Sequence, residues 1–310
     1  MTTVSSTPTP SSSARPTPPR VTYAARPESP RRPTPRWVRW SVTTGKYLSL
    51  VAVSLAMVVP LVVVVFTSLK THEEAAVSNP LSPPHDWFNL HNYAVAFTDG
   101  RMLPAFLNTT FILVISVVGN IIVGSMAAYA IDRFEFRFKK LVLVLFLLAT
   151  LVPSVTTQVA TFQVIDTLGL FNTRWSAIAL YMGTDILSIY IFLQFIRGIP
   201  VSLDESARLD GASSFTIYRR IILPLLRPAI ATVVIIKGIF VYNDFYVPFL
   251  YMPSSDLGVV STSLFRFKGP FGAQWEAISA GAILVILPTL AVFLALQRLI
   301  YNGMTSGSTK

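Results

Sequence analysis

A polar and charged stretch, "DESARLDGASSFTIYRRIILP" (Asp204–Pro224), interrupts a sequence that is strongly apolar on both sides of it. Just before it, Ser202 stands three residues ahead of Glu205, which is the spacing of a reciprocal helix N-cap. Gly211 can adopt the left-handed conformation that ends a helix, and Ser213 or Ser214 can cap a second helix. The spacing therefore predicts two short helices separated by a break, stiff enough to transmit a push.

The second of these predicted helices has one apolar face. Tyr218, Ile221, Ile222 and Leu225 follow one another at three- and four-residue spacing, which places their side chains on one side of a helix. Pro224, near the end of the helix, predicts a bend back toward the apolar sequence that follows. A loop that merely tethered two segments would not need this much helix design.

The sequence carries no motif for covalent chemistry. It has no G-x-x-x-x-G-K-[ST] loop for binding ATP and no G-x-S-x-G or H-E-x-x-H pattern of a hydrolase. It has no cysteine, and His72, His85 and His91 fall in one predicted loop without further ligands. We therefore expect no catalytic residue, no metal site and no cofactor bound by this chain.

The composition is that of a membrane protein. Hydrophobic residues make up 52% of the chain, charged residues only 13%, and the mean hydropathy is +0.58, whereas a soluble domain needs more charge on its surface. Segments of about 20 apolar residues can cross a hydrocarbon core of about 30 Å. We expect an all-α polytopic membrane protein with six transmembrane helices, near Tyr47–Leu69, Phe106–Ala130, Leu141–Thr161, Ser176–Phe195, Ala229–Met252 and Ala277–Leu299.

Lysine and arginine are divided unevenly between the two sides of these six segments. With the N-terminus inside, nineteen lie in the inner segments and five in the outer ones, and Lys237 lies within a span. Basic residues favour the cytoplasmic side, so we predict a multi-pass protein of the cytoplasmic membrane with both termini cytoplasmic. The Asp204–Pro224 stretch then faces the cytoplasm. Orientation also explains the net charge of +10, so no nucleic-acid partner is needed.

The first 36 residues differ from the rest of the chain. They are rich in Pro, Ser, Thr and Arg, as in "STPTPSSSARPTPPR". Such a composition buries too little apolar surface to offset the entropy of ordering a chain, so residues 1–36 are predicted to be a disordered cytoplasmic tail. A solvated extension without a specific partner and a segment attracted to anionic lipid headgroups are both open.

The polar stretch contains three short motifs, Glu205-Ser206-Ala207, Asp210-Gly211-Ala212 and Ile222-Leu223-Pro224. They resemble the cytoplasmic signature loop of ABC importer permeases, which runs Glu-Ala-Ala, then Gly, then Ile-x-Leu-Pro. Ser206 departs from the pattern, because the family most often has Ala there. The resemblance implies that residues 201–225, approximately, form a coupling helix that docks on a separate ATP-hydrolysing subunit. The residues that it assigns to this coupling are Glu205, Ser206, Ala207, Asp210, Gly211, Ile222, Leu223 and Pro224.

Other stretches extend the resemblance over nearly all of the chain after residue 45, toward the maltose-type, carbohydrate-importing branch. They include "PLVVVVFTSLKTHEEA", "AAYAIDRFEF", "LGLFNTRWSAI" and "VYNDFYVPFL". The resemblance implies that residues 37–310 form a six-span permease domain in membrane lipid, which translocates a sugar by alternating access. It also implies three kinds of partner: a second homologous permease subunit, two ATP-binding subunits that use ATP and Mg, and an extracytoplasmic solute-binding lipoprotein.

Polar residues inside the predicted spans are the candidates for contact with the substrate, because charges in a bilayer are costly and usually face a cavity or a partner. We hypothesise that they meet sugar hydroxyls along the pathway. The alternative is that they bridge helices within the bundle or to the second permease. The candidates are Asp185, Tyr242, Asn243, Asp244 and Tyr246.

Two other classes of protein are weighed against the importer permease. An ion-coupled secondary transporter would often show internal repeats, which this sequence lacks, and it would leave the polar stretch without a purpose. A membrane-embedded enzyme would need a nucleophile and a base, for which there is no signal. Within the importer class, the sugar is open, and another solute such as glycerol phosphate is an alternative.

Overall fold

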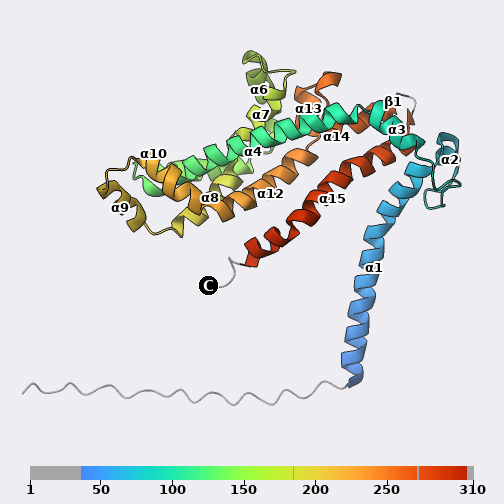
Figure 1. Cartoon of the computed structure of the whole chain (residues 1–310), viewed down its shortest axis with the longest axis horizontal. Coiled ribbons are helices and arrows are strands. Elements are labelled where there is room, and N and C mark those ends of the chain that lie inside the picture. The colour runs from blue at the N-terminus through green and yellow to red at the C-terminus, as the bar shows by residue number, and fades with distance from the viewer. Residues whose placement is uncertain (1–35, 184, 271, 306–310) are drawn as a thin grey trace, which may run out of the picture. The chain divides into compact units, whose positions relative to one another are not determined.

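The computed structural model describes residues 36–183, 185–270 and 272–305, and these are mostly helical (Figure 1). Residues 1–35 of the predicted disordered tail lie outside this range. The first helices are α1 (Arg36–Leu69), α2 (His72–Val77), α3 (His91–Thr98), α4 (Met102–Arg133), α5 (Lys139–Leu151), α6 (Ser154–Thr167), α7 (Arg174–Met182), α8 (Ile186–Arg197) and α9 (Ser202–Leu209).

The second half of the chain alternates longer helices with single turns. It contains α10 (Ser214–Ile217), the π-helix η1 (Tyr218–Ile222), α11 (Leu223–Leu225), α12 (Arg227–Asn243), α13 (Tyr246–Tyr251), the 3₁₀ turn η2 (Ser255–Leu257), α14 (Val260–Ser263), the 3₁₀ turn η3 (Leu264–Phe267) and α15 (Trp275–Thr305). Two antiparallel strands of two residues each, β1 (Lys268–Gly269) and β2 (Gly272–Ala273), qualify the prediction of an all-α fold. The chain divides after Ala56, within α1, and the contacts described below lie in the unit from Met57 onward.

In the described chain, two continuous helices are long enough to span a membrane. The stretch Thr43–Leu69 of α1 has 27 residues and α4 has 32, and both are strongly apolar. Three further pairs of consecutive helices are long and apolar enough only if each bent pair is taken together, which gives up to five spans. The apolar part of the last helix, Trp275–Ala291, is shorter.

The third, fourth and fifth predicted spans are each interrupted. The third breaks between α5 and α6 with a bend of 107°, because Pro153 has no N–H and forces Val152 into an extended conformation. The fourth bends by 41° between α7 and α8, beside Gly183. The fifth ends at Asn243 and resumes at Tyr246 as α13.

Helix α4 forms the centre of the described bundle. It packs along α8 and α7 and against α12, and α4, α8 and α12 lie side by side in Figure 1. Small residues allow this approach, because a Cβ added to Gly124 would come within 3.4 Å of the Phe192 ring on α8. At one end of these helices Ala128, Phe192 and Ile196 join Ile222 and Leu226 in one buried apolar cluster. The polar stretch of the sequence is thus built into the main core.

A buried lysine organises the loop that follows α1. Lys70 is only 1% exposed, and its Nζ donates to Ser78 Oγ at 2.9 Å, to the Asn79 carbonyl at 2.9 Å and to Ser82 Oγ at 3.1 Å. The Lys70 carbonyl in turn accepts a hydrogen bond of 2.7 Å from the Asn92 amide on α3. The ammonium therefore closes residues 70–82 onto the end of α1 through three neutral oxygen atoms.

Substitution Lys70→Met tests this arrangement. Methionine fills a similar volume but leaves the three acceptors without their donor, at a cost of about 1–3 kcal/mol. We expect faster hydrogen–deuterium exchange of the backbone amides in residues 70–82, measured by mass spectrometry on the detergent-solubilised protein. Lys268→Met, at an exposed position, is the matched control. Unchanged exchange in the Lys70 variant would contradict the structural role.

Candidate functional site

The coupling segment, residues 201–225, folds as two helical pieces joined at Gly211, as the sequence predicted. Gly211 has φ +81°, and its N–H donates to the Arg208 carbonyl while that of Ala212 donates to the Ala207 carbonyl. These two bonds form a Schellman motif, which satisfies the last carbonyls of α9. No atom lies within 4 Å of a Cβ added to Gly211, so only the backbone conformation requires glycine here.

The sequence predicted an N-terminal cap for each of the two helical pieces, and the structure contains the predicted cap only in the second piece. Ser213 caps the second piece, accepting a hydrogen bond of 3.3 Å from the Thr216 N–H. The predicted capping box of Ser202 and Glu205 is wrong. Helix α9 begins at Ser202 itself, after Val201 in a helical conformation, so the Ser202 hydroxyl lies inside the first turn and cannot cap it.

The second piece is wound more loosely than an α-helix. Tyr218–Ile222 form a π-turn, in which the Leu223 N–H donates to the Tyr218 carbonyl five residues back. The extra residue in this turn shifts the buried face by one position. Tyr218 and Ile222 of the predicted apolar face are buried, but Leu225 is 49% exposed and Leu226 takes its place in the core.

Both pieces of the coupling segment have one buried and one exposed face. Ala207, Ala212 and Leu223 are partly buried against the core that holds Ile222. Apolar side chains also reach the surface, Leu209 being 90% and Phe215 61% exposed. The remaining residues that the sequence assigned to coupling are all exposed, namely Glu205, Ser206, Asp210, Gly211 and Pro224.

The chain turns by 73° where the coupling segment meets α12. The break is at Leu226, two residues after the Pro224 to which the sequence analysis assigned it. Pro228 contributes as well, because it has no N–H to bond the Pro224 carbonyl four residues back. Two prolines therefore limit the backbone bonding on either side of the turn.

A buried ionic cluster lies where α9 meets the end of α4, and the sequence analysis did not identify it. Arg133 Nε lies 2.7 Å from Asp204 Oδ2, with side-chain exposures of 5% and 3%. Arg133 also donates to Asp132 Oδ2 and to the Ile199 carbonyl, both at 2.8 Å. Nothing in the spacing of these residues signals their contact, because the fold brings together positions about seventy apart.

Two charges inside the predicted spans pair with each other. Lys237 Nζ on α12 lies 3.2 Å from Asp185 Oδ2, which directly precedes α8, and both side chains are at most 20% exposed. Ser188 Oγ donates to the same carboxylate at 2.8 Å. Opposite charges in an apolar bundle are expected to pair, but the sequence did not show which carboxylate Lys237 would meet.

Asp244 has a different set of partners, at the break between α12 and α13. Its carboxylate accepts from the Tyr181 hydroxyl of α7 at 2.9 Å and from the Tyr246 N–H at 2.8 Å, and its carbonyl accepts from Ser261 Oγ at 2.7 Å. Asp244 thus caps α13 and connects three parts of the bundle. These contacts are those of the helix-bridging alternative.

The three remaining candidates for the substrate pathway are divided. Tyr242 donates to the Val285 carbonyl of α15 at 2.8 Å, which bridges two helices. Asn243 is exposed and, in the part of the chain that the structure describes, donates within its own helix to the Ile239 carbonyl at 2.9 Å. Tyr246 is 46% exposed and its hydroxyl bonds to Gln158 of α6. Asn243 and Tyr246 therefore present polar groups at the surface of this chain.

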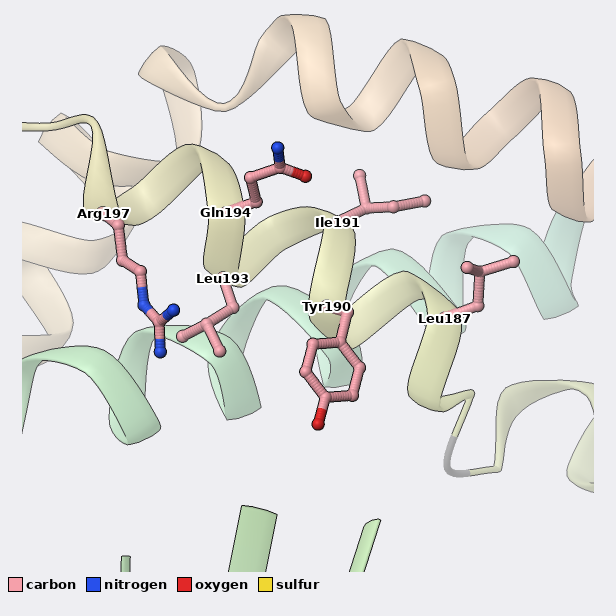
Figure 2. Close-up of a pocket in the computed structure, with 6 residues that line it drawn as sticks. All are labelled: Leu187, Tyr190, Ile191, Leu193, Gln194 and Arg197. Carbon is pink, nitrogen blue, oxygen red and sulfur yellow. The ribbon is translucent and has the colours of Figure 1, made fainter. Parts of the chain in front are cut away.

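A hollow of about 560 Å³ lies beside α8, and the described residues that line it all belong to that helix (Figure 2). None of the five candidate pathway residues lines it. In residues 36–183, 185–270 and 272–305, no group of three His, Asp or Glu side chains could hold a metal ion. The residues of the hollow are Leu187, Tyr190, Ile191, Leu193, Gln194 and Arg197.

Residues 120–306 match the model of a protein family described as "binding-protein-dependent transport system inner membrane component". The chain is 31% identical over 262 residues to the melibiose/raffinose/stachyose import permease protein MelC of Bacillus subtilis (strain 168), which covers 83% of this chain and 93% of the relative. It is 30% identical to the maltodextrin transport system permease protein MalD of Streptococcus pneumoniae (strain ATCC BAA-255 / R6), over 85% of this chain and 94% of the relative.

A solved structure has the same fold. It is that of a bacterial ABC transporter involved in the import of the acidic polysaccharide alginate, with a TM-score of 0.71. The likeness covers 86% of this chain and 98% of that one, at 18% sequence identity. At this identity the comparison concerns the fold alone.

The Asp185–Lys237 pair can be tested by a double-mutant cycle. Lys237→Met leaves a carboxylate unpaired in an apolar bundle, and we expect it to cost about 3–5 kcal/mol, measured as a lower melting temperature of the purified protein in detergent. The double variant Asp185→Asn/Lys237→Met has no unpaired charge and should recover most of the loss. Asn243→Ala, which removes an exposed amide, is the control and should melt normally. Additive losses in the double variant would show that the pair does not couple the two helices.

Proposed function

The chain belongs to the family of binding-protein-dependent transport system inner membrane components, and we propose that it is the permease subunit of an ATP-driven importer of a sugar, either a di- or oligosaccharide or an amino sugar. A member of this family is a transport component of a membrane, not an enzyme. The names of its relatives include galactooligosaccharides, maltodextrin and melibiose as cargo. They support a sugar as substrate, with another solute such as glycerol phosphate as the alternative.

The observation that carries this proposal is the two-faced coupling segment. One face is fixed in the main core by Tyr218 and Ile222. The other presents Glu205, together with Leu209 and Phe215, at the surface. Large exposed apolar side chains beside a carboxylate are typical of a protein–protein contact, and the segment lies within the residues that match the family. This face is proposed to dock on the ATP-hydrolysing partner.

The proposed topology has six membrane-crossing segments in residues 37–310 and both termini in the cytoplasm, with residues 1–36 as a cytoplasmic tail. The excess of lysine and arginine in the inner segments supports this orientation. Two of the crossings would be the bent pairs α5–α6 and α7–α8, one would be α12 continued by α13, and one would be α15, beside the two continuous helices. Irregular backbone at membrane depth is tolerated where it is buried in protein or lines a cavity.

The proposed assembly contains this chain, a second homologous permease, two ATP-binding subunits and an extracytoplasmic solute-binding lipoprotein, in membrane lipid. ATP and Mg would be used by the partner subunits alone. Closure of those subunits would move the coupling segment, and the core contacts of that segment would pass the movement to α4 and α8. The spans would then alternate between outward and inward access.

The proposed pathway for the sugar is built on Asn243 and Tyr246, since both are exposed on this chain. A phenol ring and an amide suit the stacking and hydrogen bonding that sugars require. Asp185, Tyr242 and Asp244 would act in the pathway only through the helices that they bridge.

Deleting the gene in its own host and measuring uptake of radiolabelled oligosaccharides tests the function. We expect loss of uptake of one sugar, restored by the full-length chain and dependent on ATP. Purification of the tagged chain should also bring down an ATP-binding subunit. Unimpaired sugar uptake in the deletion strain together with a chain that purifies alone would contradict the proposal and favour a secondary transporter.

Gly211 gives a sharper test of the coupling segment. A Cβ at φ +81° costs about 1–2 kcal/mol and more for a β-branched side chain, so Gly211→Val should disturb the end of α9 through the local backbone, with no clash from the rest of the chain. We expect loss of sugar-stimulated ATP hydrolysis in the assembled complex. Asn tolerates this conformation, so Gly211→Asn should retain more of it.

Gly45→Val is the matched control, because a Cβ there meets no atom within 4 Å and the residue lies within a helix. It should leave coupling unchanged. Equal coupling in Gly211→Val and the unsubstituted complex would count against the role assigned to the segment.

A further inference from the structure

One guanidinium connects three parts of the chain at the base of the coupling segment. Arg133 is the last residue of α4. Its three nitrogen atoms meet Asp132 of the same helix at 2.8 Å, the Ile199 carbonyl of the α8–α9 connection at 2.8 Å and the Asp204 carboxylate of α9 at 2.7 Å. A planar guanidinium fixes the direction of each partner, which a flexible ammonium does not.

These contacts constrain the corner between α8 and α9. The corner contains Gly198 and Pro200, neither of which can continue a regular helix well. Ile199 lies before the proline and Asp204 after it, and Arg133 holds both. The contacts of Arg133 therefore oppose rotation of α9 about the corner relative to α4.

The cluster is poorly explained as a source of stability. Arg133 and Asp204 are almost completely buried, and removing two charges from water costs as much as their attraction returns. The Nε–H is not aligned with the carboxylate as a hydrogen bond, and within the described structure neither Asp204 oxygen has such a bond. Apolar residues of similar size would serve packing equally well, so the pair fits a role in fixing geometry.

The second piece of the coupling segment is fastened to the same helix. The Tyr218 hydroxyl is 2.8 Å from Ser125 Oγ of α4 in the buried core, and the Tyr218 ring lies 5.6 Å from the ring of Tyr129. Both pieces thus attach to α4. The second piece, α10 and η1, does so by packing and a neutral hydrogen bond, and the first piece, α9, by a charged pair. Helix α4 in turn packs along α8, α7 and α12.

We propose that Arg133 and Asp204 form a rigid link that makes α9 and α4 move together, so that Arg133 is a positioning residue for energy coupling. The inference rests on the proposed function, since it concerns how a push on the coupling segment reaches the spans. Its specific content is that α4 receives the movement first and passes it to the helices packed around it.

The test uses the double variant Arg133→Met/Asp204→Leu in the complete transporter in proteoliposomes. Both charges are removed together, because a single substitution would leave one buried charge unpaired and could prevent folding. We expect an assembled complex that melts no lower than the unsubstituted one and still hydrolyses ATP. Sugar taken up per ATP hydrolysed should fall about tenfold, within the range of coupling between two sites.

The matched control is Arg137→Met, which makes the same change at an exposed arginine four residues further along, whose guanidinium faces only the Phe138 ring in the contacts described. It should leave the uptake per ATP unchanged. A loss of equal size in the control would show that the local positive charge matters and would overturn the proposal.

Spin labels give a second measurement, because the chain contains no cysteine and two introduced ones are unique. Leu203→Cys lies on α9 and Met126→Cys on α4, and both positions are exposed. We expect a narrow distance distribution in the otherwise unsubstituted complex and a broad one when Arg133→Met/Asp204→Leu is added. A distribution that stays narrow would overturn the link.

The outcomes separate this inference from the proposed function. An unsubstituted complex without ATP-dependent uptake would defeat the proposed function itself. Normal uptake per ATP in the double variant, with the unsubstituted complex active, would overturn only the link. A double variant that fails to assemble would assign the pair to folding and would also overturn it.

Discussion

The described structure depends on one constraint: in so apolar a chain, polar and charged groups find few partners in the interior. With 13% charged residues, each charge that enters the interior needs a specific partner, since an unpaired one would cost several kcal/mol. Lys70 meets three neutral oxygens, Lys237 meets Asp185, and Arg133 meets Asp204. Each of these contacts lies at an irregular segment. Lys70 contacts the loop after α1, Arg133 contacts the corner between α8 and α9, and the Asp185 that pairs with Lys237 directly precedes α8.

The same constraint explains why the helices break where they do. A proline or glycine frees backbone groups, and a nearby polar side chain can satisfy some of them, as Asp244 does for the Tyr246 N–H at the start of α13. Such a break is also a position about which two halves of a span can move. A transport cycle requires motion of this kind, and helices without breaks would resist it.

The role proposed for the coupling segment combines two needs that conflict in most surface loops. A contact with another subunit calls for exposed side chains, whereas the transmission of force calls for rigid attachment. The segment meets both by turning opposite faces outward and inward: Phe215 is 61% exposed, while Ile217 beside it is fully buried. The Schellman motif at Gly211 fixes the angle between the two pieces without using a side chain.

The sequence by itself determined the class of the protein, the apolar segments, the break at Gly211 and the motif of the coupling segment, because each depends on composition or on residues close together in the chain. It also placed Tyr218 and Ile222 on one apolar helix face, from helical spacing alone. It did not show how sharply the third, fourth and fifth spans bend, since a run of apolar residues looks the same whatever the angle of the helix at Pro153. The exposure of Leu225 depended on a π-turn that no local pattern signals. Only the tertiary structure decided that Asp204 meets Arg133 and that Lys237 meets Asp185, because the pairing of charges distant in sequence is set by which helix faces pack together.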